Sequence, residues 1–298
     1  MQTVPLEAPA PASPLAHARD LLLLAKPRLS GLVVTTAAGG MALAPGHIGV
    51  ARGILLVVGT AAVVGAANAL NEFLERDVDA RMRRTRDRPL PAGRMEPWVA
   101  LALGLLVPTF GIPLLALTTT PLTGLLALVA LVTYVAVYTP LKQRSSLALF
   151  VGAIPGAIPP LMGWTGVTGR LEPGGLALFA LLFAWQLPHF LAVSLYLRED
   201  YARGGLRVFA LVHGERATRV AIAVTAALVV PISLALVPLR LAGPGYGVAA
   251  GVAGAALVGY AMRGLTRGAG ARWARNFFLA TLVYLTVLLA ALFLSAPR

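Results

Sequence analysis

Residues 68–93, NALNEFLERDVDARMRRTRDRPLPAG, end a long apolar run with a cluster of charged residues. Residues 53–67 before this stretch are almost entirely apolar, whereas the stretch itself holds five carboxylates, two asparagines and six arginines. Charged groups are costly inside a bilayer and collect where a spanning helix meets water. The stretch therefore predicts the end of a membrane helix, and its acidic residues need a separate explanation.

Composition points to a polytopic membrane protein. The 298 residues are 58% hydrophobic and 12% charged, with a mean hydropathy of +0.79, which leaves too little polar surface to cover a soluble globule. A spanning helix needs roughly 20 apolar residues. We expect an all-α bundle of nine spanning helices around a central cavity that opens to the cytoplasmic side, at about 23–44, 53–75, 97–117, 120–138, 147–164, 174–197, 217–237, 243–262 and 275–296.

Residues 1–20 differ from the rest of the chain. They are rich in Pro and Ala and contain no apolar core of signal-peptide length, so we expect a disordered cytoplasmic tail. Residues 21–298 are expected to form a single transmembrane domain. The chain has no cysteine, which excludes disulfides, thiolate metal sites and thiol nucleophiles.

The net charge of +13 follows the membrane and does not indicate nucleic acid. Of the 25 Lys and Arg residues, 21 fall on the N-terminal segment and on alternate connections between predicted spans. The positive-inside rule then predicts a multi-pass protein with its N-terminus cytoplasmic and its C-terminus outside, and we expect it in the inner (plasma) membrane. The basic residues assigned to the other side are Arg52, Arg170, Arg240 and Arg298.

The acidic residues are more informative, because the positive-inside bias does not explain them. All of the 12 Asp and Glu residues except Glu172 fall on the predicted cytoplasmic side, most of them after spans two and six. If the second helix continues, side chains spaced by three and four residues share one stripe, with Glu72 beside it. That stripe consists of Asn68, Asn71, Glu75 and Asp79.

This oxygen-rich stripe is typical of a Mg²⁺ site, since Mg²⁺ takes one or two carboxylates and completes its shell with water and phosphate oxygens. Arginines follow at once, and their forked donors match phosphate oxygens, so the combination predicts a diphosphate site. The alternative is a solvated helix end with ion pairs along the helix, such as Glu72 with Arg76. The arginines in question are Arg84, Arg86 and Arg88.

These residues resemble the first signature of the intramembrane prenyltransferases typified by the 4-hydroxybenzoate enzyme. Within that group the chain resembles the protohaem IX farnesyltransferase branch along nearly its whole length. The matching segments are Asn68-x-x-Asn71-x-x-x-Glu75-x-x-x-Asp79, Arg84-Thr85-x-x-Arg88-Pro89, Lys26-Pro27-Arg28, Tyr138-Thr139-Pro140-Leu141-Lys142, Gly152 to Ala157 with Pro159-Pro160, Trp185-Gln186-x-Pro188-His189-Phe190, Arg198-Glu199-Asp200-Tyr201 and Val212-His213-Gly214.

The segment around His189 favours the haem branch. Quinone-type enzymes of this group carry a second aspartate-rich motif here, whereas this chain has His189 inside the span and only Glu199-Asp200 at its end. Neutral imidazole is a natural axial ligand of haem iron. Three other roles stay open for His189: orienting the porphyrin, handling a proton, or a hydrogen bond between helices.

The resemblance implies a mechanism and a set of site residues. Mg²⁺ would hold the diphosphate of farnesyl diphosphate through the α-helical stripe, with Asp200 on a second ion, while basic residues neutralise the leaving group. The haem vinyl group would attack the farnesyl carbon, and water would complete the product. The implied catalytic residues are Asn68, Asn71, Glu75, Asp79, Arg84, Arg88 and His189; the implied metal ligands are Asn71, Glu75, Asp79 and Asp200; and the implied substrate contacts are Lys142, Asp200, Glu199, Tyr138, Trp185 and Arg198.

Two other functions remain open from the sequence. An aromatic-acid or quinone prenyltransferase would need the aspartate-rich second motif, and a transporter would need polar residues along several mid-membrane faces. Here the charge collects at one rim. The resemblance further implies farnesyl diphosphate, haem B and the lipid bilayer as partners, no nucleic acid, and haem A synthase or terminal oxidase assembly factors as associates.

Overall fold

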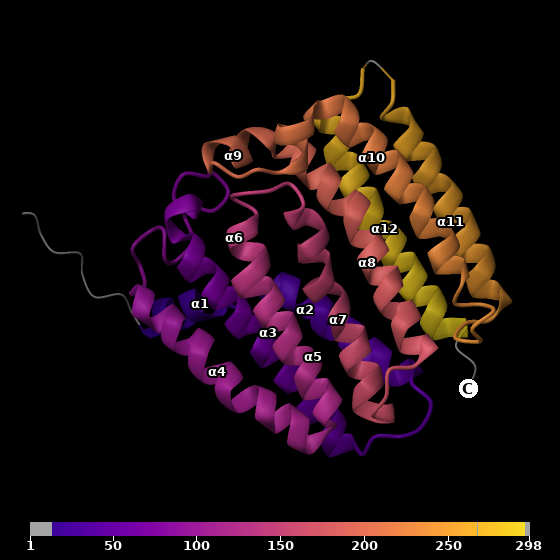
Figure 1. Ribbon diagram of the computed structural model, residues 1–298, viewed down its shortest axis with the longest axis horizontal. Coiled ribbons are helices and arrows are strands. Elements are labelled where there is room, and N and C mark those ends of the chain that lie inside the picture. Colours follow the sequence, from indigo (N-terminus) through magenta and orange to yellow (C-terminus); the bar gives the residue numbers. More distant parts are fainter. Residues whose placement is uncertain (1–13, 267, 296–298) are drawn as a thin grey trace, which may run out of the picture.

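The computed structural model describes residues 14–266 and 268–295, and every regular element within these ranges is helical. The expected all-helical bundle is confirmed (Figure 1). The elements in chain order are α1 (Pro14–Leu24), α2 (Pro27–Leu43), α3 (Val50–Asp79), α4 (Pro97–Thr118), α5 (Pro121–Val132), the π-helix η1 (Thr133–Tyr138), α6 (Thr139–Leu141), α7 (Ala148–Thr168), α8 (Pro173–Tyr196), α9 (Arg198–Arg203), α10 (Phe209–Leu234), α11 (Pro244–Arg263) and α12 (Ala271–Ser295).

Eight helices in the described part of the chain are long and apolar enough to cross a membrane. One of them is the continuous rod Pro121–Leu141, formed by α5, η1 and α6. The pair α1 and α2 makes a ninth candidate if its two halves, bent by 56°, count as one span. The predicted spans therefore recur in order, the first of them as a broken pair.

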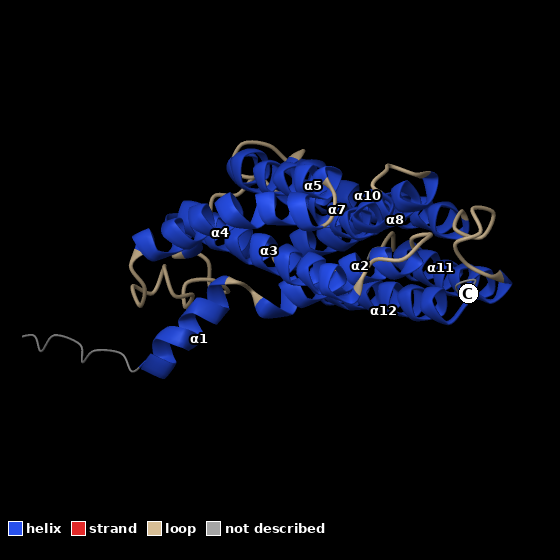
Figure 2. Cartoon of the chain, turned by 90° about the horizontal axis from the view of Figure 1, so that it is seen from below, coloured by secondary structure: helices blue, strands red, loops and turns tan. Residues whose placement is uncertain are grey.

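The break between α1 and α2 lies at Lys26, where the sequence predicted a continuous span from about residue 23. Pro27 has no N–H to continue the hydrogen bonding of α1, and Lys26 takes up a left-handed conformation, φ 48°. The expectation of a disordered tail up to residue 20 is wrong for residues 14–20, which belong to α1; residues 1–13 lie outside the described residues. Figure 2 shows α1 leaving the bundle.

A second difference concerns the segment after α8. Helix α10 begins at Phe209, earlier than the predicted residue 217. It includes a helical segment before Gly214, where the backbone is not helical (φ 81°, ψ 171°) and the helix bends. Glycine tolerates this conformation without a Cβ clash. The short helix α9 lies across the end of the bundle, where Asp200 accepts a hydrogen bond from the loop that follows α3 (Figure 1).

Small residues let the helices pack closely. A Cβ on Gly163 of α7 would lie 2.6 Å from the backbone nitrogen of Met41, and Gly40 of α2 abuts the Pro160 carbonyl in the same way. Close backbone approach through glycine is the usual means of helix association in lipid. Helices α8, α10, α11 and α12 form one side of the bundle around the largest apolar core, and α3, α4 and α5 pack together on the other side (Figure 1).

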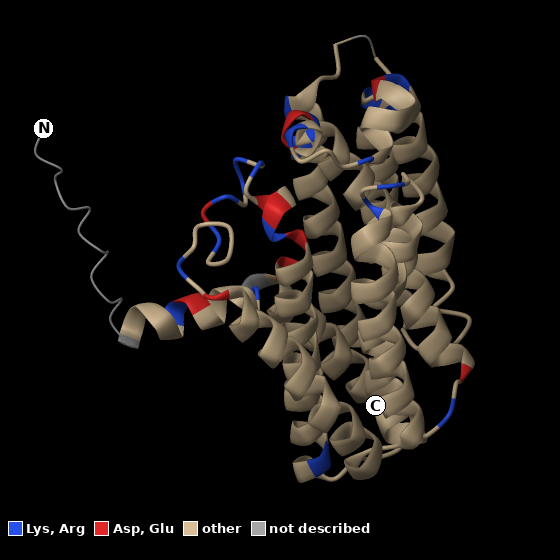
Figure 3. Ribbon diagram, turned by 60° about the vertical axis from the view of Figure 1, so that its left-hand side comes forward, with Lys and Arg blue, Asp and Glu red and all other residues tan. Residues whose placement is uncertain are grey.

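Charged residues gather at one end of the bundle (Figure 3). This end holds the loop after α3, the segment after α6 and the α8–α9 corner, which are joined by contacts such as the hydrogen bond from Arg83 to Asp200. Far fewer charges lie at the opposite end (Figure 3). The fold thus brings the two acidic clusters of the sequence to the same rim.

Candidate active site

The acidic end of α3 is buried. Because α3 runs as one helix from Val50 to Asp79, the predicted stripe forms, and its members are no more than 2% exposed. These are Asn68, Asn71, Glu72, Glu75 and Asp79. They lie beside a cavity of about 430 Å³, called here the α3 cavity, whose lining includes Lys26, Asn71, Glu75, Asp79, Arg84, Arg88, Tyr138 and Lys142.

Three cations from different segments approach this stripe. Lys142 Nζ, after α6, lies 2.5 Å from Glu75 Oε2, and Arg88 Nη1 donates to Asp79 Oδ2 over 2.7 Å. Lys26 Nζ, at the break before α2, donates to Asn71 Oδ1 over 2.9 Å. Buried carboxylates are tolerated when paired in this way. The segments that supply these cations are separated by up to 116 residues of sequence and meet only in the fold.

The solvated helix end, which was the alternative for this stretch, is not what the structure has. Glu72 is 1% exposed and pairs with Lys26 and Arg88, at 3.7 and 3.8 Å, whereas Arg76 pairs with Asp77 and lies over the Phe73 ring. The Glu72–Arg76 pair of that alternative does not form. The stripe therefore faces the bundle interior and not bulk water.

Two buried carboxylate oxygens of α3 have no hydrogen-bond partner among the described residues. Asn71 Nδ2 donates to Glu75 Oε2 over 2.9 Å and to Thr139 over 3.1 Å, yet the other Glu75 oxygen, Oε1, is buried without a hydrogen-bond partner, as is Glu72 Oε2. An unsatisfied buried carboxylate oxygen is costly. A hard divalent cation would satisfy such atoms.

The oxygen ligands at the α3 cavity fit a Mg²⁺ ion whose coordination shell is completed by the phosphate oxygens of a substrate. Among the described residues no three His, Cys, Asp or Glu side chains form a ready-made metal cluster. Glu75 and Asp79 with the Asn71 amide match an ion that takes one or two protein carboxylates and otherwise relies on water and phosphate oxygens. Phosphate oxygens of a bound diphosphate could complete the coordination shell of such an ion.

Lys142 is charged at this site. It follows the last residue of the rod Pro121–Leu141, so it lies outside the apolar span. Burial lowers the pKa of Lys142, but Tyr138 and Glu75 outweigh burial and raise this pKa above its ordinary value. Its ammonium also lies 5.3 Å from the centre of the Tyr138 ring. The raised pKa favours the ammonium form of Lys142 opposite Glu75.

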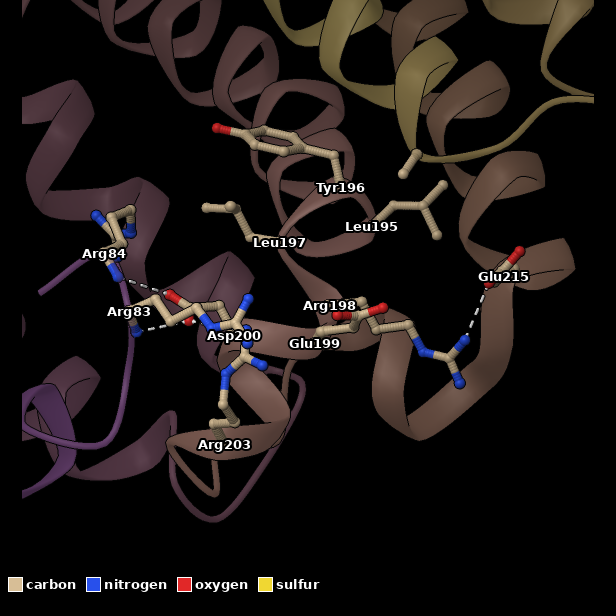
Figure 4. A pocket seen from close by; sticks show the side chains of 11 residues that line it. Arg83, Arg84, Leu195, Tyr196, Leu197, Arg198, Glu199, Asp200, Arg203 and Glu215 are labelled. Carbon is tan, nitrogen blue, oxygen red and sulfur yellow. Dashed lines mark hydrogen bonds and ion pairs between the residues drawn. The ribbon is translucent and has the colours of Figure 1, made fainter.

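A second cavity of about 590 Å³, called here the α9 cavity, opens beside α9 (Figure 4). It is lined by Arg83, Arg84, Leu195, Tyr196, Leu197, Arg198, Glu199, Asp200, Arg203, Glu215 and Ala271. Arg84 lines both cavities, so the two adjoin.

Asp200 has a different place from the one predicted. Its carboxylate oxygens accept hydrogen bonds from the backbone N–H groups of Arg83 and Arg84, over 2.8 and 3.3 Å (Figure 4). Burial raises the pKa of the Asp200 carboxyl, but these backbone donors and Arg203 outweigh it and hold the pKa below its usual range. Asp200 lines the α9 cavity, apart from Asn71, Glu75 and Asp79, and it ties α9 to the loop after α3.

His189 is buried between aromatic rings of α8 and α12. Its ring stacks on Trp185 with centroids 4.7 Å apart and lies 4.6 Å from Phe278, and it lines neither cavity. His189 Nδ1 lies 2.7 Å from Thr281 Oγ1, which donates its own proton to the Phe278 carbonyl over 2.6 Å. Because a hydroxyl has one proton, Thr281 must accept from Nδ1–H. The Nε2 lone pair of His189 is therefore left free of any described partner.

The remaining predicted contacts divide between the cavities and the core. Tyr138 lines the α3 cavity, while Arg198 and Glu199 line the α9 cavity, where Arg198 pairs with Glu215 at 2.9 Å. Trp185 lines neither cavity: it is 4% exposed, and its indole N–H donates to the Thr281 carbonyl over 2.7 Å. Trp185 supports His189 instead of forming a cavity wall.

Sequence reasoning missed several residues of these sites. Lys26 was noticed only as part of a matching segment, although a Lys before Pro at the head of an apolar span is itself a signal of a broken helix. Thr139 and Thr281 gave no local signal, because a lone Thr inside an apolar helix is common. No spacing in the sequence distinguishes Arg83 from its neighbouring arginines.

Comparisons with known proteins show the family to which the chain belongs. The UbiA prenyltransferase family model matches residues 32–294. A protoheme IX farnesyltransferase of Anaeromyxobacter sp. (strain Fw109-5) is 72% identical over 284 residues, 95% of this chain and 96% of the relative. The Myxococcus xanthus (strain DK1622) protein of the same name is 48% identical over 282 residues, 94% of this chain and 96% of the relative.

Solved structures share the fold at low identity. A digeranylgeranylglyceryl phosphate synthase superposes with a TM-score of 0.79 at 14% identity, over 94% of this chain and 98% of its own. A UbiA homologue from Archaeoglobus fulgidus, bound to DMAPP and Mg²⁺, gives a TM-score of 0.64 at 15% identity, over 92% and 99%. With the family model matching most of the sequence and relatives matching nearly all of it, the chain belongs to the UbiA prenyltransferase family.

Proposed function

We propose that the chain transfers the farnesyl group of farnesyl diphosphate to a vinyl group of protohaem IX (haem B), with addition of water, to give haem O and diphosphate. The observation that carries this proposal is the α3 cavity, where a buried Asn–Glu–Asp stripe faces three cations from distant segments. The names of the bacterial relatives support the choice of substrates.

Asn71, Glu75 and Asp79 are the residues proposed to hold Mg²⁺, and the free Glu75 Oε1 is the atom best placed to gain from it. When bound, the ion neutralises charge on the diphosphate oxygens. Asp200 is left out of this ligand set because backbone N–H groups occupy its carboxylate. The Mg²⁺ named for the Archaeoglobus fulgidus homologue supports the choice of metal.

Lys26, Arg84, Arg88 and Lys142 are proposed to stabilise the leaving group. As the C–O bond of farnesyl diphosphate breaks, negative charge grows on the diphosphate, and fixed cations around a partly enclosed cavity stabilise that charge. Arg88 and Lys142 are held in place by Asp79 and Glu75, so they need little reorganisation. The apolar wall formed by Leu29, Leu149, Phe190 and Val193 suits the start of the isoprenoid tail.

The acceptor is proposed to lie along α8. The vinyl carbon forms the new C–C bond with the farnesyl carbon, diphosphate departs, and water adds to the resulting cation with loss of a proton. His189 is proposed to face the haem through its unprotonated Nε2, which is the nitrogen suited to an axial iron ligand. Trp185, whose ring stacks on His189, keeps the imidazole plane fixed.

The reaction is tested by expressing the chain in a host that lacks haem O and analysing extracted haems by mass. We expect protohaem to gain a farnesyl group and the elements of water, and a strain carrying Asp79→Asn to lack this product. Absence of the product, together with prenylated 4-hydroxybenzoate, would replace the proposal with the quinone-type activity. Association with haem A synthase or oxidase assembly factors is tested in the same strain by affinity capture of the tagged chain.

We further propose that the rim carrying both cavities faces the cytoplasm, with the N-terminus on that side. The absence of cysteine makes a clean test available, because single cysteines can be introduced at Arg86 and Arg170, both of them exposed. An impermeant maleimide added to intact spheroplasts should label Arg170→Cys and leave Arg86→Cys unlabelled. The reverse pattern would invert the topology.

A further inference from the structure

The α9 cavity is separate from the diphosphate site but adjoins it. Of the residues lining the two cavities, only Arg84 is common to both. The α9 cavity is also the larger, at about 590 Å³ against about 430 Å³. A ligand in the α9 cavity would therefore lie next to the diphosphate without competing for Asn71, Glu75 or Asp79.

The α9 cavity is lined by four arginines and three carboxylates, Glu199, Asp200 and Glu215, so its lining keeps a net charge of +1. Arg198 pairs with Glu215, and Arg203 pairs with Asp200. Arg83 and Arg84 also line the cavity, but within the described residues neither guanidinium makes an ion pair or a hydrogen bond; only their backbone N–H groups are used, by Asp200 (Figure 4). Two neighbouring arginines with free forked donors are suited to carboxylates.

Asp200 fixes the backbone that carries these two arginines. Its ionised carboxylate accepts both N–H groups, and its low pKa keeps it ionised at neutral pH. The loop after α3 is thereby held against α9, so that residues 83 and 84 stay at the mouth of the cavity. Pre-organised donors bind an anion with less ordering cost than mobile ones.

The part of the α9 cavity lining that comes from the end of α8 is largely apolar, and ring contacts connect it to His189. Leu195, Tyr196 and Leu197 form this part, and the Tyr196 ring lies 5.6 Å from Phe278, which in turn lies 4.6 Å from His189. Tyr196 follows His189 by seven residues, two helical turns, so both lie on the same face of α8, roughly 10 Å apart along its axis. A ligand with an anionic edge and a broad apolar body matches this arrangement.

We propose that the α9 cavity binds the carboxylate-bearing edge of the acceptor, a tetrapyrrole with two carboxylates, through Arg83 and Arg84, while the macrocycle extends along α8 toward His189. This inference rests on the proposed haem-directed activity and deepens it. It assigns Arg83 to acceptor binding only, and Arg84 to both substrates. Because the α9 cavity lies at the end of α8 and His189 lies further inside, the edge of the macrocycle without carboxylates would lie deeper in the bundle.

The test compares protohaem with its dimethyl ester as acceptors for the purified full-length enzyme. For the wild type we expect the KM for the diacid to be about tenfold below that for the diester, the factor of one charge-assisted hydrogen bond. Arg83→Gln should raise the KM for the diacid by about the same factor and leave the KM values for the diester and for farnesyl diphosphate unchanged. Arg81→Gln is the matched control, since Arg81 is exposed and lines neither cavity.

Equal KM values for diacid and diester with the wild type would overturn the inference, and this comparison needs no variant. So would an Arg83→Gln effect that is the same for both acceptors, or one that Arg81→Gln reproduces. If the wild type prenylates neither acceptor while it consumes farnesyl diphosphate with another, the proposed function itself fails, which is a distinguishable result.

Discussion

Lys142 Nζ lies 2.5 Å from Glu75 Oε2, and this contact joins the segment after α6 to the buried face of α3. The two residues are 67 positions apart in the sequence. Because Glu75 keeps its other oxygen free, the pair presents both a cation and an anionic oxygen to one cavity. The first prediction follows from this pairing.

Lys142→Gln should lower kcat/KM for farnesyl diphosphate by about 10²-fold, because a fixed cation beside the leaving group is lost. It also leaves the Glu75 carboxylate without its counterion. Lys142→Arg should recover part of the loss. Initial rates with varied farnesyl diphosphate measure this, and Arg144→Gln serves as the control, since Arg144 is exposed and lines neither cavity. If Lys142→Gln reacted at the wild-type rate, Lys142 would have no role in stabilising the leaving group.

Asp79→Asn should abolish most turnover, and any residual rate should need a higher Mg²⁺ concentration, because a carboxylate ligand becomes a neutral amide. Arg88→Lys should retain more activity than Arg88→Gln, because Lys keeps the positive charge although it loses the bidentate guanidinium donors. A Mg²⁺ titration of initial rates tests both. The matched control is Asp77→Asn, whose side chain is 89% exposed. An unchanged Mg²⁺ dependence in Asp79→Asn would count against the ligand assignment.

Thr281 is expected to act as a positioning residue for His189. Thr281→Val keeps the shape but removes the oxygen that accepts Nδ1–H, so the imidazole loses its fixed orientation and tautomer. We expect a weaker imidazole band in the absorption spectrum of bound protohaem, no change in KM for farnesyl diphosphate, and recovery in Thr281→Ser. His189→Ala should lose the band entirely. A spectrum unaffected by His189→Ala would assign His189 to helix packing.

Asp200 should make stability depend on pH in the acid range. Its pKa is lowered in the folded protein, so its contribution is present above the ordinary value of 3.8 and is lost as the pH falls through the lower folded value. The Tm of Asp200→Asn should therefore lie below that of the wild type at pH 7 and at pH 5, and the gap should narrow progressively as the pH falls below about 3.8. Thermal unfolding in detergent measures this, with Glu199→Gln as the exposed neighbour. A gap that persists unchanged at pH 3 would contradict the linkage.

Gly163→Ala should destabilise the bundle by about 1–3 kcal/mol, because its Cβ would press on the backbone of α2 near Met41. The Tm in detergent should fall by several degrees. Gly251→Ala is the control: no atom lies within 4 Å of its Cβ position, so the greater helix propensity of Ala should leave the Tm equal or slightly higher. Equal changes in Tm for the two substitutions would show that α2 and α7 pack less closely than the contact at Gly163 indicates.

Local pattern was enough for the helices and for the acidic stripe. The apolar runs predicted the spans because lipid requires every backbone group to be satisfied within a helix. The spacing of Asn68, Asn71, Glu75 and Asp79 predicted a shared face, and α3 has it. The break at Lys26 and the bend at Gly214 were missed, because helix interruption depends on which packing partners accept the freed backbone groups.

A helical membrane protein with an oxygen-rich rim follows from composition and from the 3.6-residue period of one helix. Helix packing, by contrast, selects the cations that meet Asn71, Glu75 and Asp79, the loop that Asp200 anchors and the hydrogen bond from His189 to Thr281. Those contacts join residues up to 117 positions apart. No local period encodes them, because they depend on how whole helices pack.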